Sequence, residues 1–178
     1  TIVFYDSPFE TLERIIASQA SVYPGGAGLW KEVFSKWVQT KMHIPDIIRT
    51  QLKFKRNIQM ALHHLSHAAS AFYPSPFSNA AILTVDGVGE WATATIGVGT
   101  GNEIKLIKEM NYPHSVGLLY SAFTYYTGFK VNDGEYKLMG LAPYGDPEYV
   151  DLIKKEIVHI NDDGSILLNM DYFAFRES

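Results

Sequence analysis

Two histidines and an aspartate are the side chains of this sequence best suited to hold a metal ion. His63 and His67 stand four positions apart, which places both imidazoles on one face of a helix, close enough to grip one cation. Asp86 ends an apolar run, and Gly87 and Gly89 follow it, leaving backbone that a phosphate can approach. Histidine and carboxylate ligands suit Fe(II), Mn(II) or Zn(II), and the sequence does not choose among these ions. The pattern therefore predicts a metal site with a phosphate beside it.

Each of these residues also has a simpler interpretation. Two histidines on one helix face can be satisfied by backbone or water, and an Asp-Gly pair can be a plain turn between strands. A metalloprotease helix carries Glu next to its first histidine, but here that position is His64, so the general base of a protease is missing. His64 points about a quarter-turn away from the pair, and we expect it to be a neighbouring polar group rather than a ligand.

The segment from Gly134 to Gly145 is a second candidate for binding a ligand. The glycines at its two ends bracket one short helical stretch that carries Glu135 and Lys137. The hydroxyls of a ribose need an acceptor such as Glu135, and a phosphate would attract Lys137. An exposed Glu/Lys surface turn has the same composition, so composition alone favours that simpler explanation.

The elements that must position these residues follow from hydrophobic periodicity and turn residues. We expect strands over 2–5, 57–62, 80–85, 92–98, 104–110 and 166–170, and helices from 8, over 29–38, 46–52, 63–73, 116–126, 135–141 and 146–159. Ser7 and Glu10 form a predicted capping box, and the glycine-rich stretch 25–28 is a predicted linker. The strands 80–85, 92–98 and 104–110 form a predicted antiparallel meander with Asp86 at its first corner. This mixture of meander and flanking helices is α/β in class.

Bulk composition excludes several functions. The chain has 178 residues, a net charge of −4 and a pI of about 5.8, so no overall field attracts nucleic acid or an anionic membrane. Cysteine is absent, which excludes disulfides and thiolate metal sites and fits a cytoplasmic protein. No run approaches the length of a transmembrane helix. Thr1 opens the chain directly on a strand and no cap closes it, so we expect a piece of a larger protein.

Four collinear motifs resemble the NodU/CmcH-type O-carbamoyltransferases. They lie at residues 63–77, 84–91, 117–129 and 134–145. The resemblance implies an actin-like ATPase (ribonuclease H-like) fold, present in part and shared with Kae1 proteins. It implies that residues 1–56 are the variable helical connecting region of a Kae1-like domain and that residues 57–178 are its metal- and nucleotide-binding part. The family's N-terminal segment and its C-terminal YrdC-like domain are expected to be missing parts of the same chain.

The resemblance also implies a reaction. In that family the YrdC-like domain makes carbamoyl-adenylate from ATP and carbamoyl phosphate, and the carbamoyl group passes to a hydroxyl of a sugar-like or antibiotic-like acceptor. The family's metal is held by two histidines and by aspartates, which match His63, His67 and Asp86 here, while a further aspartate ligand has no counterpart. An isolated fragment is therefore expected to be inactive.

The resemblance also implies nucleotide-binding and catalytic roles for individual residues. The glycines at 87, 89 and 134 would let backbone approach the nucleotide, and Glu135 and Lys137 would meet its polar groups. His64 and His114 are the candidate catalytic bases, with a group in the missing segments as an equal alternative.

Other functions fit the same residues. A metal-dependent hydrolase would use a water held by the two histidines and the aspartate and would need no nucleotide. A non-catalytic metal- and nucleotide-binding domain would bind both ligands without transfer, and a kinase of the actin-like superfamily would transfer phosphate instead. The sequence does not identify the acceptor or the oligomeric state.

Overall fold

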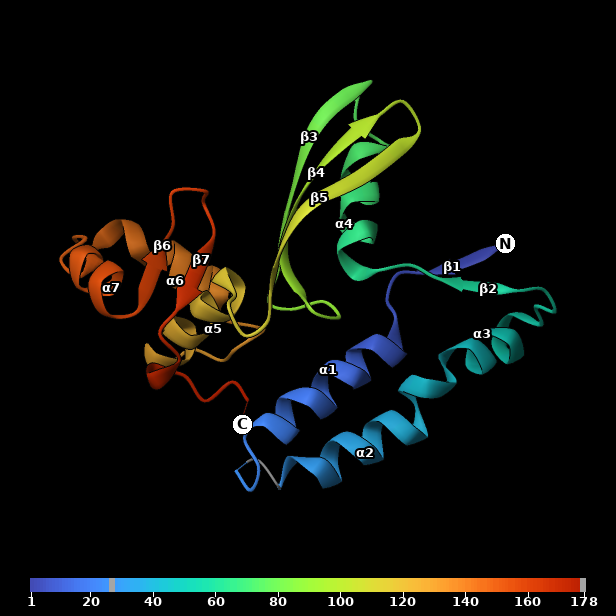
Figure 1. Ribbon diagram of the computed structural model, residues 1–178, viewed down its shortest axis with the longest axis horizontal. Helices are drawn as coiled ribbons and strands as arrows, with labels where there is room; N and C mark the ends of the chain where they lie inside the picture. The colour runs from blue at the N-terminus through green and yellow to red at the C-terminus, as the bar shows by residue number, and fades with distance from the viewer. Residues whose placement is uncertain (26–27, 177–178) are drawn as a thin grey trace.

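The strands of the chain lie in three small sheets, which the computed structural model describes over residues 1–25 and 28–176. The predicted linker over 25–28 therefore lies partly outside the described residues, at 26–27. The first sheet pairs β1 (Ile2–Phe4) with β2 (Ile58–Met60) in parallel. Between these strands the chain forms α1 (Pro8–Ser21), α2 (Leu29–Gln39), the 3-10 turn η1 (Lys41–His43) and α3 (Ile44–Leu52). Figure 1 shows these helices beneath the first sheet.

The second sheet is the predicted antiparallel meander, and the structure confirms it. It contains β3 (Asn79–Val85), β4 (Ala92–Thr100) and β5 (Glu103–Asn111) in the order β3-β4-β5. Helix α4 (His63–Phe72) packs on one face of this sheet, where Ala68 and Phe72 form a buried cluster with Ile82. Gly99 makes room for this packing, because a Cβ there would lie 2.6 Å from the Phe72 ring. Helix α4 is therefore held against β3, with its first turn beside the end of that strand (Figure 1).

The C-terminal part holds the remaining helices and a two-stranded hairpin. Its elements are α5 (Val116–Tyr126), α6 (Glu135–Leu141), η2 (Ala142–Tyr144), α7 (Val150–Glu156), β6 (Val158–Ile160), β7 (Ile166–Leu168) and η3 (Met170–Tyr172). The predicted helix over 146–159 was wrong at both ends, since α7 is shorter and its last predicted turn is the strand β6. The turn at Gly164, whose φ is +81°, lets β6 pair with β7. That pairing overrides the local helical pattern.

The observed class is mixed α/β with an antiparallel sheet, as the sequence predicted. Among the described residues no helix combines the length and the apolar character needed to cross a membrane.

Candidate metal centre

Three side chains from two elements meet where α4 begins and β3 ends. Nε2 of His63 lies 2.7 Å from Oδ2 of Asp86, and Nε2 of His67 lies 3.1 Å from the same oxygen. The two Nε2 atoms are themselves 3.1 Å apart. The helix supplies the two rings because residues four apart share a face, and the packing of α4 on β3 brings Asp86 to them. The structure therefore brings together all three residues that the sequence selected.

The triangle formed by these atoms fits a divalent cation. Ligand atoms about 2.1 Å from one ion stand about 3.0 Å apart on an octahedral face and about 3.4 Å apart in a tetrahedron. The observed edges of 2.7, 3.1 and 3.1 Å are closer to the octahedral value. Hydrogen bonding alone satisfies the triangle poorly, because protons on both Nε2 atoms would leave the contact between the rings repulsive. Two imidazoles and a carboxylate with open positions suit Fe(II), Mn(II) or Zn(II).

The surroundings of Asp86 favour the ionised form of its carboxyl group. Burial acts to raise its pKa, but hydrogen bonds from the His63 ring, the Gly87 N–H and the His67 ring outweigh burial and bring the pKa below its usual value. The Gly87 N–H donates to Oδ1 over 2.6 Å, which leaves Oδ2 directed at the two rings. The carboxylate is thus both ionised and oriented near neutral pH.

The backbone that carries Asp86 is fixed by the start of α5. Ser115 is fully buried; its hydroxyl lies 2.6 Å from the carbonyl oxygen of Gly87 and 3.1 Å from that of Asp86, and it accepts the N–H of Leu118. A Cβ on Gly117 would lie 2.6 Å from the carbonyl carbon of Asp86 and from the nitrogen of Gly87. Ser115 has a sequence signal as the residue before a helix, whereas Gly117 begins one of the four motifs but was not selected as a site residue.

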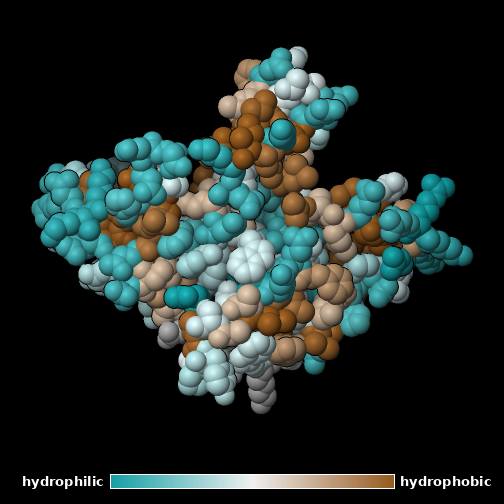
Figure 2. Space-filling view, viewed as in Figure 1, coloured by the Kyte–Doolittle hydropathy of each residue, from teal (hydrophilic) through white to brown (hydrophobic). Residues whose placement is uncertain are grey.

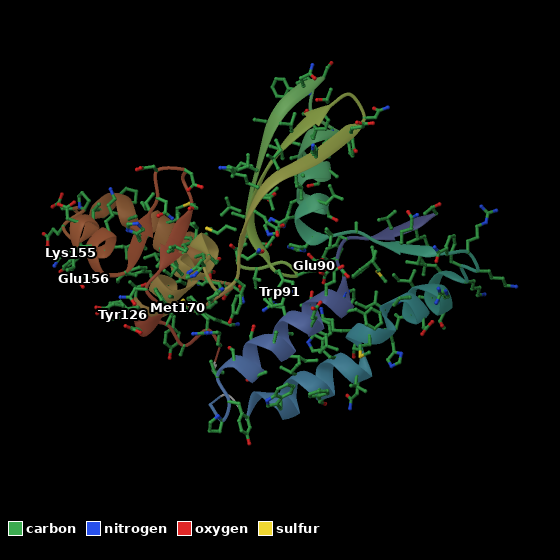
Figure 3. The ribbon with its side chains drawn as sticks, in the orientation of Figure 1. Glu90, Trp91, Tyr126, Lys155, Glu156 and Met170 are labelled. Carbon is green, nitrogen blue, oxygen red and sulfur yellow. The ribbon has the colours of Figure 1, made fainter. Side chains whose placement is uncertain are left out.

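Glu90 anchors the other side of the site and was not selected from the sequence. It is only 5% exposed, and its carboxylate accepts the backbone N–H of His63 at 3.0 and 3.1 Å and that of Ser7 at 2.8 Å. Its carbonyl oxygen accepts a hydrogen bond from Nε of Arg14. Figure 3 shows Glu90 where the 86–91 loop meets the start of α1. His63, the first candidate ligand on α4, is therefore held by a carboxylate from the loop that supplies Asp86.

This arrangement also explains why the predicted capping box is wrong. The Ser7 side chain makes no capping hydrogen bond, and its N–H donates to Glu90 instead of Glu10. The neighbouring carboxyl of Asp6 has a raised pKa, first because it is buried and then because it shares a hydrogen bond with the negatively charged Glu90.

His64, a predicted catalytic base, points into the protein. It is 2% exposed, and its Nδ1 lies 2.6 Å from Oγ1 of Thr84, which in turn lies 2.7 Å from Oγ1 of Thr95. Burial lowers the pKa of His64, and the nearby rings of His63 and His67 lower it further. The neutral ring is thus part of a buried polar chain between α4 and the sheet.

We expect His64→Ala to lower the free energy of unfolding by about 2–4 kcal/mol, because it leaves a cavity and removes one of the two hydrogen-bonding partners of the Thr84 hydroxyl. Metal affinity should fall less than in His63→Ala, since the His64 ring is not one of the three converging groups. Chemical denaturation and metal titration of the two variants would check this. A His64 variant that keeps full stability but loses its metal would contradict the assignment.

His114, the other candidate base, lies among C-terminal elements. Its Nδ1 accepts the N–H of Leu168 at 3.1 Å, and its carbonyl oxygen accepts the Thr93 hydroxyl at 2.6 Å. Burial lowers the pKa of His114, and the positive charge of Arg176 lowers it further. None of its hydrogen bonds within the described residues reaches the three converging groups.

The three predicted nucleotide-binding glycines differ in their surroundings. A Cβ on Gly89 would lie 3.0 Å from Cβ of His63, and one on Gly134 would lie 2.7 Å from Cβ of Phe129. The missing side chains of Gly89 and Gly134 therefore allow close packing against other residues of the same chain. Only at Gly87, among these three, would a Cβ find ordinary space, with Leu118 at 3.8 Å.

Glu135 and Lys137 make local contacts. The Glu135 carboxylate accepts the Asn132 N–H at 2.9 Å and the Ser121 hydroxyl at 3.2 Å, and the Asn132 bond is the largest cause of its lowered pKa. The Lys137 ammonium lies 5.6 Å from the ring centre of Tyr136. Glu135 thus joins α5 to α6, and among the described residues no hydrogen bond or ion pair links either side chain to the histidines.

Comparisons with known proteins agree with the motifs. Residues 1–178 match the family described as "Carbamoyltransferase N-terminus". The uncharacterized protein sll1178 of Synechocystis sp. is 48% identical over 98% of this chain and 30% of its own length. Nodulation protein NolNO of Sinorhizobium fredii is 41% identical over 64% of this chain and 17% of its own length. Nodulation protein NolO of Bradyrhizobium diazoefficiens is 35% identical over 61% of this chain and 20% of its own length. The chain thus spans less than a third of each of these relatives.

Proposed function

This chain belongs to the carbamoyltransferase family whose N-terminal part it matches, and we propose that the protein containing it transfers a carbamoyl group to a hydroxyl of a small sugar-like or antibiotic-like acceptor. We propose further that His63, His67 and Asp86 hold a divalent cation for this reaction. The observation that carries the proposal is the convergence of two imidazole nitrogens and a carboxylate oxygen within 3.1 Å of one another.

The residues of the chain would each contribute a defined property. His63 and His67 offer neutral ring nitrogens, and Asp86 offers an anion held in place by the Gly87 N–H. When bound, the cation supplies a positive charge that attracts the phosphate oxygens of a nucleotide. The open space at Gly87 supports placing that phosphate beside Asp86, in preference to Gly89 or Gly134.

The proposed transfer starts from carbamoyl-adenylate, made from ATP and carbamoyl phosphate. The acceptor oxygen forms a bond to the carbamoyl carbon, the bond from that carbon to the phosphate oxygen breaks, and AMP leaves. The hydroxyl proton passes to a base. Because His64 is buried and His114 accepts a hydrogen bond from Leu168, we propose that this base comes from outside residues 1–178.

We also propose that the chain forms part of an actin-like ATPase fold, with residues 57–178 as its metal- and nucleotide-binding part. The antiparallel meander β3-β4-β5, with a ligand-bearing helix on one face, supports this assignment.

The decisive experiment incubates the full-length protein with ATP, carbamoyl phosphate and Fe(II), Mn(II) or Zn(II) in turn, and follows the products by mass spectrometry. Carbamoyl-adenylate and AMP, followed by a carbamate on an added sugar, are the expected products. Hydrolysis without nucleotide would support a metal hydrolase, and phosphate on the acceptor would support a kinase. Binding of metal and ATP without either product would support a non-catalytic domain.

Metal binding should weaken as the pH falls. Histidine binds a cation only through an unprotonated nitrogen, and an ordinary imidazole takes up its proton near about pH 6.5. Asp86 stays ionised through this range because its pKa is lowered, so a loss of metal there would not come from protonation of the carboxylate. We expect metal content after dialysis to fall as the pH drops from about 7.5 to 5.5. Occupancy that persists unchanged at about pH 4.5 would contradict histidine ligation.

A further inference from the structure

The charges of this chain are segregated between the two ends of the molecule. Residues 41–56, here called the basic end, contain five lysines and arginines and a single acidic residue, whereas residues 146–163 contain six acidic residues and two lysines. The basic end lies around α3 and the acidic span around α7, and Figure 1 shows these two helices at opposite ends of the molecule. The net charge of −4 therefore describes the chain as a whole and not the end that carries α3.

The basic end is most concentrated where α3 stops. Lys53 has a left-handed backbone, with a φ of +49°, and its N–H donates to carbonyl oxygens of the last helical turn. Phe54 is half-buried, whereas Lys53, Lys55 and Arg56 are exposed. The end of the helix thus presents three cationic side chains to solvent.

These three cations are not neutralised within the described part of the chain. Lys53, Lys55 and Arg56 form no ion pair with any residue that the structure describes. Arg49, one turn earlier, does pair with Asp46 at 2.9 Å, and both of those side chains are exposed. A cluster of unneutralised cations attracts a surface that carries many negative charges.

Exposed aliphatic side chains lie on the same helix. Leu52, the last residue of α3, is 64% exposed, and Ile47 is 42% exposed. Figure 2 shows hydrophobic atoms beside the hydrophilic right-hand tip of the molecule, where α3 leads into β2. The interface of a lipid bilayer accepts both kinds of group, because aliphatic side chains enter it while lysine and arginine pair with anionic headgroups.

We propose that the basic end docks on the surface of a membrane that contains anionic lipids. Nucleic acid would pair with the lysines and arginines but would leave Leu52 and Ile47 in water. The acidic end of a second copy is also complementary, but such a head-to-tail contact leaves a basic end free and does not close into a dimer.

The docking is peripheral and reversible. Two exposed aliphatic side chains are few, so attraction between charges dominates the binding and salt weakens it. The proposal goes beyond carbamoyl transfer and does not rest on it.

Sedimentation of the full-length protein with lipid vesicles tests the proposal. Vesicles of phosphatidylcholine alone are compared with vesicles that also contain about 30% phosphatidylglycerol, at about 0.05 M and about 0.5 M NaCl. We expect at least about tenfold tighter binding to the anionic vesicles at low salt, and loss of this difference at high salt. Equal binding to both kinds of vesicle, or binding that does not fall with salt, would overturn the proposal.

Charge reversal locates the docking surface. The triple variant Lys53→Glu, Lys55→Glu and Arg56→Glu should weaken binding to anionic vesicles by at least about 100-fold, because each basic residue near such a surface contributes about fivefold. The matched control changes three exposed lysines outside the basic end, in the triple variant Lys105→Glu, Lys130→Glu and Lys154→Glu. The control alters the net charge by the same amount and should weaken binding by less than about threefold. An equal loss in both variants would mean that overall charge, and not the basic end, causes the binding.

Leu52→Asn distinguishes a membrane from other polyanions. It should weaken binding to anionic vesicles by about threefold or more, because the leucine no longer enters the bilayer interface. A DNA duplex that binds more tightly than the vesicles and is unaffected by Leu52→Asn would overturn the proposal in favour of nucleic acid. Self-association without vesicles that the Lys53, Lys55 and Arg56 variant abolishes would overturn it in favour of a second copy.

Discussion

Asp86→Ala is expected to weaken the binding of Mn(II) or Zn(II) by at least about 100-fold, because changes that only disturb residues behind a ligand already weaken metal binding by about 10–100-fold. The substitution removes the only anion of the triangle and leaves two neutral rings 3.1 Å apart. Isothermal titration of the metal-free protein would measure the loss. Asp46→Ala is the matched control, because Asp46 is an exposed carboxylate on α3 that pairs with Arg49.

Two further variants separate ligation from stability. His63→Ala should reduce metal content as strongly as Asp86→Ala, since His63 contributes another corner of the triangle. Asp86→Asn retains an oxygen that can accept the Gly87 N–H but lacks the charge, so it should remain folded and bind metal poorly. Equal metal content in the wild-type protein and in folded His63→Ala would rule out this site.

Gly117→Ala should lower the free energy of unfolding by about 1–3 kcal/mol, the usual result of forcing an extra methyl into a packed region. The new Cβ would stand 2.6 Å from backbone atoms of Asp86 and Gly87, which cannot rotate away. The 86–91 loop must therefore shift, and we expect metal affinity to fall with stability. Chemical denaturation and metal titration on the same samples would show both effects.

Gly140→Ala provides the control for this substitution. Gly140 lies in α6, and a Cβ there would have no heavy atom within 4 Å. Because alanine favours helix over glycine, stability should stay the same or rise by up to about 0.5–1 kcal/mol. A similar loss in both variants would mean that the contact between α5 and the Asp86 backbone has no special importance.

The parts of the fold with strong local periodicity could be predicted from the sequence. The meander follows from apolar runs separated by turns, and the helix over 63–72 follows from its pattern and from the prolines beyond it. The metal triangle needed one further assumption, that this helix packs on the strand ending at Val85. Strand β7 falls within the strand predicted over 166–170, but its partner β6 was missed because Val158 and Ile160 fit a helical pattern as well as a strand.

The residues that hold the site in place could not be predicted in this way. Glu90 lies 83 positions from Ser7 and 27 from His63, so only the folded chain shows that it binds both backbones. Gly89 looks like a phosphate-binding glycine in the sequence, yet its missing side chain makes room for His63. Local sequence patterns indicate which groups can bind a ligand, whereas tertiary packing determines which glycines and carboxylates support them.

The double attachment of Glu90 has a mechanical consequence. The Glu90 carboxylate accepts the backbone N–H of Ser7, just before α1, and that of His63, the first residue of α4. A tilt of either helix would therefore displace the other. Nε of Arg14, also on α1, donates a hydrogen bond to the carbonyl oxygen of Glu90 and restricts the movement of α1 further. A molecule that bound to α1 and displaced this helix would therefore also displace the ring of His63, without contacting His63 itself.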